Sequence, residues 1–86
     1  MIYITKQSII LNGDIMKFKR IYDLRIDNDK TQQEIADYLM CNRQVYSRYE
    51  RGLREIPVSM VIKLAKYYNT STDYILGITE NPKPYK

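Results

Sequence analysis

The stretch from Thr31 to Arg51, TQQEIADYLMCNRQVYSRYER, constrains the fold more than any other part of the chain. It reads as two short helices joined by a tight turn. Thr31 and Glu34 have the spacing of a capping box, in which each side chain accepts a hydrogen bond from the backbone N–H of the other residue. Asn42 is a favourable N-cap for the second helix, and Gly52 is a typical residue for ending it.

The second helix has two faces of different chemistry when its residues are placed at about 100° per residue. Tyr46 and Tyr49 lie on the apolar face, so we expect them to fill a core rather than to stack on single-stranded bases. The opposite face carries cationic, amide and hydroxyl groups, namely Arg43, Gln44, Ser47, Arg48 and Arg51. Taken alone, this polar face fits either a solvated helix surface or the floor of a DNA major groove.

The positive charge of the chain is concentrated on this second helix and the loop behind it. The formal net charge is +4, and residues 42–54 hold four arginines against one glutamate. Residues 32–41 hold only two charged residues, Glu34 and Asp37, both acidic. This distribution favours an anionic partner for the second helix.

The residue types present argue against most enzyme classes. The chain has no histidine, the commonest general base and metal ligand, and its single Cys41 cannot form an intramolecular disulfide. We find no Gly-rich phosphate loop, no metal-binding cluster and no nucleophile–base set. No apolar run or signal peptide points to a membrane. We therefore expect a cytoplasmic protein that is not an enzyme and that needs no cofactor, no metal and no membrane, with no small-molecule ligand evident.

The chain divides into three parts. Residues 1–15, MIYITKQSIILNGDI, are an N-terminal extension that we interpret as a tail, an arm that pairs with a second subunit, or upstream sequence outside the native product. Residues 16–78 form one helical domain, and residues 79–86 form a flexible C-terminal tail that contains two prolines. We expect five helices and no sheet in the domain, at about 17–27, 31–39, 43–51, 58–68 and 72–76.

The fourth of these helices has an apolar pattern that predicts an inward face. We expect this face to consist of Val58, Val61, Ile62, Leu64, Ala65 and Tyr68.

Four segments together resemble a known family. They are TQQEIA at 31–36, SRYERG at 47–52, IPVSMVIKLAKYYN at 56–69 and STDYILG at 71–77. At this spacing, residues 16–76 are similar to the helix-turn-helix domain of the Cro and C1 repressors, also called the XRE family of bacterial and phage regulators. The resemblance implies an all-α, compact five-helix, lambda-repressor-like DNA-binding domain. Its helix-turn-helix is formed by helices 2 and 3, and helix 3 is the recognition helix that lies in the major groove.

The resemblance also implies roles for individual side chains. Gln32, at the start of the second helix, would contact a phosphate together with the exposed N–H groups there. Base edges or nearby phosphates would be contacted by Asn42, Arg43, Gln44, Ser47 and Arg48. Glutamine pairs well with adenine and arginine with guanine, each pair contributing about 1–3 kcal/mol of discrimination. Arg51 and Arg54 would meet the phosphate backbone, which fixes register but not sequence.

The remaining implications concern the anchoring and assembly of the domain. Family members place an arginine of the first helix against the glutamate at position 50, so we expect a partly buried Arg25–Glu50 pair. The chain departs from the family pattern at three points. Met40 stands where the turn usually has glycine, and Asp29 and Lys30 replace a common Gly-Leu. Tyr46 brings a hydroxyl that needs a partner to a position usually held by isoleucine or valine.

We further expect a transcriptional repressor that binds a near-palindromic operator in double-stranded DNA as a weak homodimer strengthened by DNA. The contact between subunits would include Tyr74, Ile75 and Ile78. The alternative is a protein-interaction module of the same fold, such as an antitoxin or anti-regulator that sequesters a partner.

Overall fold

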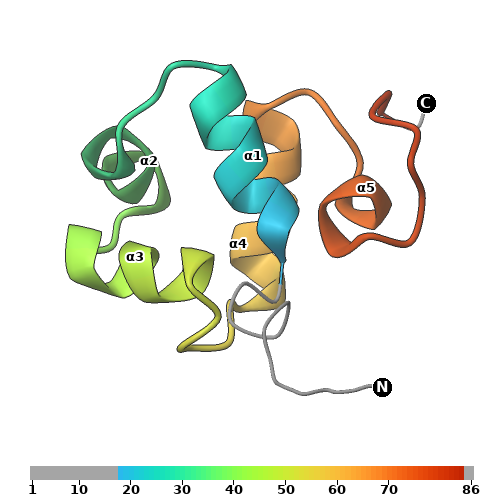
Figure 1. Ribbon diagram of the computed structural model, residues 1–86. Helices are drawn as coiled ribbons and strands as arrows, with labels where there is room; N and C mark the ends of the chain where they lie inside the picture. Colours follow the sequence, from blue (N-terminus) through green and yellow to red (C-terminus); the bar gives the residue numbers. More distant parts are fainter. Residues whose placement is uncertain (1–17, 85–86) are drawn as a thin grey trace, which may run out of the picture.

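The computed structural model describes residues 18–84, and the expected extension at 1–15 and the expected helix start at 17 lie outside this range. The described residues form five helices and no strand, as the sequence predicted (Figure 1). The helices are α1 (Lys19–Asp27), α2 (Gln32–Leu39), α3 (Arg43–Glu50), α4 (Val58–Tyr67) and α5 (Thr72–Leu76).

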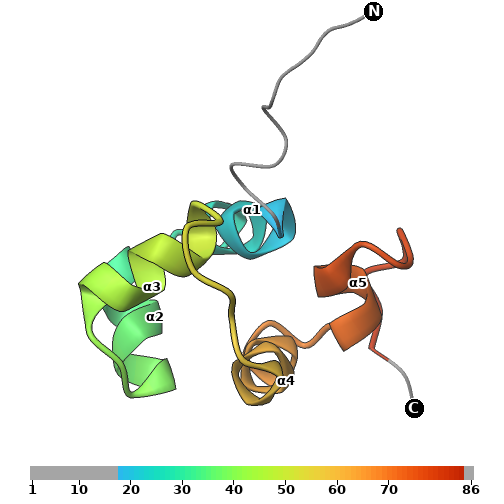
Figure 2. The ribbon, with the colours of Figure 1, turned by 90° about the horizontal axis from the view of Figure 1, so that it is seen from below.

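The five helices pack as a closed ring around one core. α1 packs mainly against α3 and α5, α2 against α3 and α4, and α4 also against α5, so each helix has two main neighbours. Figures 1 and 2 both show the α2–α3 pair on one side of the domain and α5 on the opposite side. The α2–α3 pair is therefore held from behind by α1 and α4, and no other helix among the described residues covers its outer surface.

Side-chain caps fix where α2 and α3 begin. Thr31 Oγ1 accepts from the Glu34 N–H at 3.1 Å, and Glu34 Oε1 accepts from the Thr31 N–H at 2.8 Å, so the predicted capping box is present. Asn42 Oδ1 accepts from the Val45 N–H at 2.8 Å. Between the two helices Met40 adopts the left-handed conformation with φ 61°, in the position where glycine is usual. The Met40 side chain is 85% exposed, so the core does not crowd it, and the left-handed backbone conformation costs a non-glycine residue about 1–2 kcal/mol.

The capping box makes a pH-dependent contribution to stability. The Thr31 backbone N–H, which donates to the Glu34 carboxylate, lowers the pKa of Glu34 from its ordinary value of 4.5. Because the pKa is lower in the folded chain, the contribution is complete above the unfolded pKa and is lost as the pH falls through the folded pKa. We expect the thermal midpoint of the wild-type protein to fall more than that of Glu34→Gln between about pH 5 and about pH 3. Glutamine keeps the capping box without titrating; equal falls would contradict this role.

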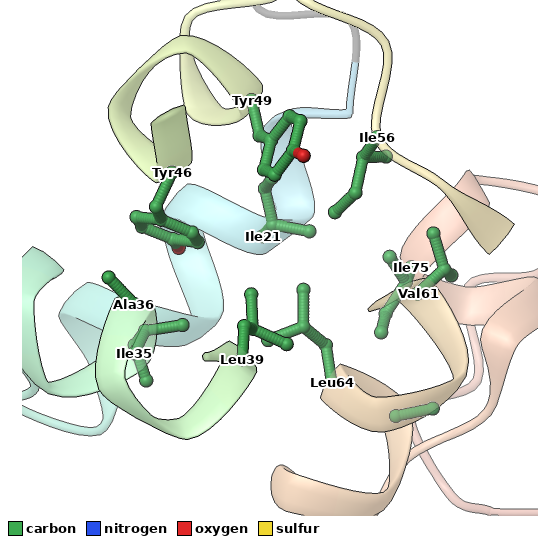
Figure 3. Close-up of a cluster of buried hydrophobic side chains, with 11 residues drawn as sticks. Ile21, Ile35, Ala36, Leu39, Tyr46, Tyr49, Ile56, Val61, Leu64 and Ile75 are labelled. Carbon is green, nitrogen blue, oxygen red and sulfur yellow. The ribbon is translucent and has the colours of Figure 1, made fainter. Parts of the chain in front are cut away.

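The core is built from apolar residues of all five helices and the loop before α4 (Figure 3). Its buried members are Ile21, Ile35, Ala36, Leu39, Tyr46, Tyr49, Ile56, Val61, Leu64, Ala65 and Ile75. Tyr46 and Tyr49 thus fill the core, as their side of the helical wheel predicted. The two faces of α3 are therefore used differently, one for packing and one for solvent.

The inward face of α4 is narrower than the sequence predicted. Val61, Leu64 and Ala65 are buried, but Val58 is 74% and Ile62 is 42% exposed. Val58 and Ile62 are four residues apart and therefore lie on one side of α4, next to the side that faces the core. There they border an open apolar groove of about 610 Å³ between the start of α4 and α5, lined also by Phe18 and Leu76.

The segment after α5, where the sequence predicted a flexible tail from residue 79, makes hydrogen bonds to the rest of the domain. Arg20 Nη1 donates to the Tyr74 carbonyl at 2.8 Å and also to the Thr79 carbonyl. The Thr70 hydroxyl donates to the Pro82 carbonyl at 2.5 Å. These contacts involve main-chain carbonyls, whose positions a residue pattern does not reveal, and they hold the segment 79–82 against α1 and the end of α4.

Candidate nucleic-acid interface

The side chains expected to meet DNA lie on the outer side of α2 and α3 and in the loop that follows. Six of them are exposed: Asn42, Arg43, Gln44, Arg48, Arg51 and Arg54. Gln32 and Ser47 are half-buried. Figure 2 shows α2 and α3 together on the side of the domain opposite α5. Six of the side chains predicted to meet DNA are thus open to solvent within the described residues 18–84.

Asn42 has a structural role in addition to any contact with DNA. Its Oδ1 accepts from the Val45 N–H and so caps α3. Only the Nδ2 group is left as a donor toward an external oxygen. Arg43, the next residue, is the first of α3 and projects from the same end of the helix.

A buried ion pair anchors α3 from behind. Arg25 of α1 donates from Nε to Glu50 Oε2 at 2.5 Å and from Nη2 to Oε1 at 3.1 Å, so the expected pair is present in a bidentate geometry. Glu50 is 1% and Arg25 is 9% exposed, which is deeper than the partly buried pair that we expected. The hydrogen bonds to Glu50 raise the pKa of Arg25, so the guanidinium stays charged. Its Nη1 also donates to the Lys30 carbonyl at 2.9 Å, which ties the loop before α2 to the pair.

Two further donors complete the surroundings of the Glu50 carboxylate. The Tyr46 hydroxyl donates to Oε2 at 2.5 Å, and Gln32 Nε2 donates to Oε1 at 3.1 Å. Burial, and then the hydrogen bond to Glu50, raise the pKa of Tyr46, so this hydroxyl remains a donor. Each carboxylate oxygen therefore accepts two hydrogen bonds, and one buried carboxylate connects α1, α2 and α3.

The sequence analysis did not find these two contacts. Tyr46 and Glu50 are four residues apart on one helix, a spacing at which side chains meet, so the sequence does contain a signal for their contact. Gln32 is 18 residues away on another helix, and no local pattern could have paired it with Glu50.

Comparison with known proteins identifies the family. A family model described as helix-turn-helix matches residues 21–75, which is more than half of the chain. The chain belongs to the Cro/C1-type helix-turn-helix family. Its members are DNA-binding transcriptional regulators and not enzymes.

The curated relatives include regulators from bacteria and a phage. The HTH-type transcriptional regulator ImmR of Bacillus subtilis is 38% identical over 65 residues, 76% of this chain and 51% of ImmR. The cryptic phage CTXphi transcriptional repressor RstR, from Vibrio cholerae, is 37% identical over 61 residues, 71% of this chain and 55% of RstR. YobD of Bacillus subtilis, an uncharacterized HTH-type transcriptional regulator, is 32% identical over 69 residues, 80% of this chain and 62% of YobD. This chain thus spans about half to two thirds of the length of these relatives. No solved structure matches it significantly.

Within residues 18–84, no three or more histidine, cysteine or acidic side chains are grouped so as to hold a metal ion. Burial raises the pKa of the Cys41 thiol, which lies in the turn before α3, and this makes it a poor nucleophile near neutral pH. None of the helices in this range is both long enough and apolar enough to span a bilayer.

One residue expected at the subunit contact of this helix-turn-helix domain is not available for it. Ile75 is 1% exposed and belongs to the core. The prediction was wrong for this residue because α5 is short and turns Ile75 toward α1 and α4, which it packs against. Ile78 is 70% exposed, and the Tyr74 ring is partly covered by the Arg20 guanidinium, whose carbon lies 4.1 Å from the ring centroid.

Proposed function

We propose that this chain binds a specific sequence of double-stranded DNA by placing α3 in the major groove, and that it represses transcription in the cytoplasm of a bacterium. One observation carries this proposal. The exposed face of α3 offers arginine and amide donors, while its other face is fixed by the buried Glu50 carboxylate that joins three helices. A rigid row of such donors suits the base edges of a major groove, because each must reach its acceptor without rearrangement. The relative RstR is a transcriptional repressor, which supports the direction of regulation.

The proposed contacts divide into base reading and backbone binding. Gln44 would pair with adenine and Arg43 or Arg48 with guanine, while Asn42 and Ser47 would contribute further donors near the bases. Arg51 and Arg54 are exposed at the end of α3 and in the next loop, where they would meet phosphates. Gln32, at the first position of α2, would contact a phosphate on the other side of the groove.

We infer a weak homodimer on a near-palindromic operator. The exposed apolar surface at Ile78, with part of Tyr74, is small, so association without DNA would be weak. Two chains bound to adjacent turns of the duplex would place their half-sites about 34–36 Å apart.

Selection of bound duplexes from a random pool tests the function. We expect enrichment of one near-palindromic sequence, and we expect its affinity to fall with salt by about 0.9 log units per phosphate neutralised per log unit of salt. Enrichment of an asymmetric site would contradict the proposed homodimer but not the proposed sequence-specific binding. A protein that enriches no sequence and binds a partner protein instead would be the sequestering module of the same fold.

A further inference from the structure

The four hydrogen bonds on Glu50 suggest more than a structural anchor, because one of the donors is Gln32. This side chain is half-buried: its Nε2 group reaches inward to Glu50 Oε1 at 3.1 Å, and the rest of the residue lies at the uncovered start of α2. An amide nitrogen carries two hydrogens, so one can stay on the carboxylate while the second points outward. Gln32 therefore links the buried carboxylate to the surface that faces the proposed DNA.

The direction of that second hydrogen depends on where the carboxylate lies relative to α3. Arg25 ties the carboxylate to α1, since both of its contacts come from that helix. The Tyr46 hydroxyl ties it to α3, because Tyr46 and Glu50 are on the same helix and the Tyr46 ring is 0% exposed. The ring belongs to the core cluster that includes Ile35 and Ala36 of α2 (Figure 3). Its position is fixed by packing, so its hydroxyl is a fixed donor.

We propose that Tyr46 is a positioning residue for DNA binding: its hydroxyl holds the Glu50 carboxylate so that Gln32 presents its free amide hydrogen to a backbone phosphate. This proposal rests on the proposed function, because it concerns how the phosphate contact of Gln32 is arranged. Tyr46 itself does not touch DNA. The recognition helix and the phosphate contact of α2 are set by the same carboxylate, so the two cannot shift independently.

A double-mutant cycle tests whether Tyr46 acts through Gln32. We expect Tyr46→Phe to weaken binding to the selected operator about three- to tenfold when Gln32 is present, and to have almost no effect in a Gln32→Ala background. Residues that act independently give additive changes, so equal effects of Tyr46→Phe in both backgrounds would overturn the proposal. No effect of Tyr46→Phe in the wild-type background would overturn it as well.

The salt dependence separates positioning from a general loosening of α3. Gln32 is neutral and releases no counterion, so loss of its contact should leave the slope of log K against log salt unchanged in Tyr46→Phe. A tilted α3 would lose arginine contacts and lower that slope by about 0.9 for each one, and this result would count against the proposal.

Two matched controls are available in the same helices. Gln33 is the neighbouring glutamine, but its Nε2 donates to Asp37 at 2.8 Å and not to Glu50. Tyr49 is the second buried tyrosine of α3, and the hydrogen bonds to the Glu50 carboxylate come from Arg25, Gln32 and Tyr46 instead. We expect Gln33→Ala and Tyr49→Phe to leave operator affinity within about twofold of wild type.

The free protein gives a readout that does not depend on DNA. In NMR spectra we expect the two Gln32 amide hydrogens to have well-separated shifts, with one protected from exchange, and we expect Tyr46→Phe to reduce both the separation and the protection. If these changes appear but no duplex is ever enriched, the proposed function fails while the internal coupling stands, and the positioning role in DNA binding falls with the function. If the operator is bound but Tyr46→Phe changes neither the shifts nor the exchange of the Gln32 amide hydrogens, only the proposal about Tyr46 fails.

Discussion

Glu50→Ala is expected to destabilise the domain by about 3–5 kcal/mol, the cost of leaving a buried charge without its partner. Arg25 would remain 9% exposed in the wild-type packing with neither of its bonds to the carboxylate. The Tyr46 hydroxyl would also lose its acceptor inside the core. Because small domains have a total stability of about 5–15 kcal/mol, this one substitution removes a large part of it. Urea unfolding followed by circular dichroism measures the change directly.

An exposed ion pair provides the control for this experiment. Lys19 Nζ and Asp23 Oδ1 are 3.3 Å apart on the surface of α1, and their side chains are 67% and 41% exposed. Lys19→Ala is expected to cost no more than about 0.5 kcal/mol, because water and salt screen such pairs. If Glu50→Ala proved as mild as Lys19→Ala, the carboxylate would not be the anchor of α3 that we describe.

A second variant tests whether the buried charges of Arg25 and Glu50 are needed for the stability of the domain. Replacing the network by apolar groups, as in Arg25→Met, Tyr46→Phe and Glu50→Leu together, removes both charges of the buried pair and the Tyr46 hydroxyl at once. Such replacements are often neutral or stabilising in other proteins. We expect this triple variant to regain most of the stability lost in Glu50→Ala and to bind the operator poorly, since Gln32 then has no carboxylate to hold it.

The residue pattern predicted the helices well because their ends are determined locally. Thr31, Glu34 and Asn42 act on backbone N–H groups three residues away, so their roles can be read from spacing alone. The Arg25–Glu50 pair could be expected only through the family resemblance, because its partners are 25 residues apart. The family resemblance is also the basis for expecting Gln32 to contact a phosphate. The hydrogen bond from Gln32 to Glu50 becomes visible only in the folded structure, because the two residues are 18 positions apart.

The errors in the predicted core have one physical origin. Apolar residues are common on protein surfaces, so an apolar side chain such as Val58 or Ile62 does not by itself show which way it points. Both belong to α4, where only a narrow stripe faces the ring of helices. The error at Ile75 is the opposite one, because this residue was predicted at the surface and is buried. The helix α5 has only five residues, and Ile75 is the one among them that is buried in the core.

The arginines that we propose to face DNA should separate into two kinds when each is replaced by alanine. Arg43 is exposed at the first position of α3, and its loss is expected to reduce discrimination at one base pair by about 1–3 kcal/mol, with a small change on scrambled duplexes. Arg54 is exposed in the loop after α3, and its loss is expected to weaken operator and scrambled duplexes alike. The physical reason is that base edges differ along the sequence whereas phosphates do not.

Binding titrations on the operator, on single-base variants of it and on a scrambled duplex distinguish these results. For Arg54→Ala the slope of log K against log salt should fall by about 0.9, because one phosphate is no longer neutralised. Lys63→Ala controls for net charge, since it removes one exposed positive charge from α4, on a helix that packs behind α2 and not beside the outer face of α3. If Arg43→Ala weakened all duplexes equally and Arg54→Ala changed the preferred base, the two roles would be reversed, and the loop rather than the start of α3 would lie against the base edges.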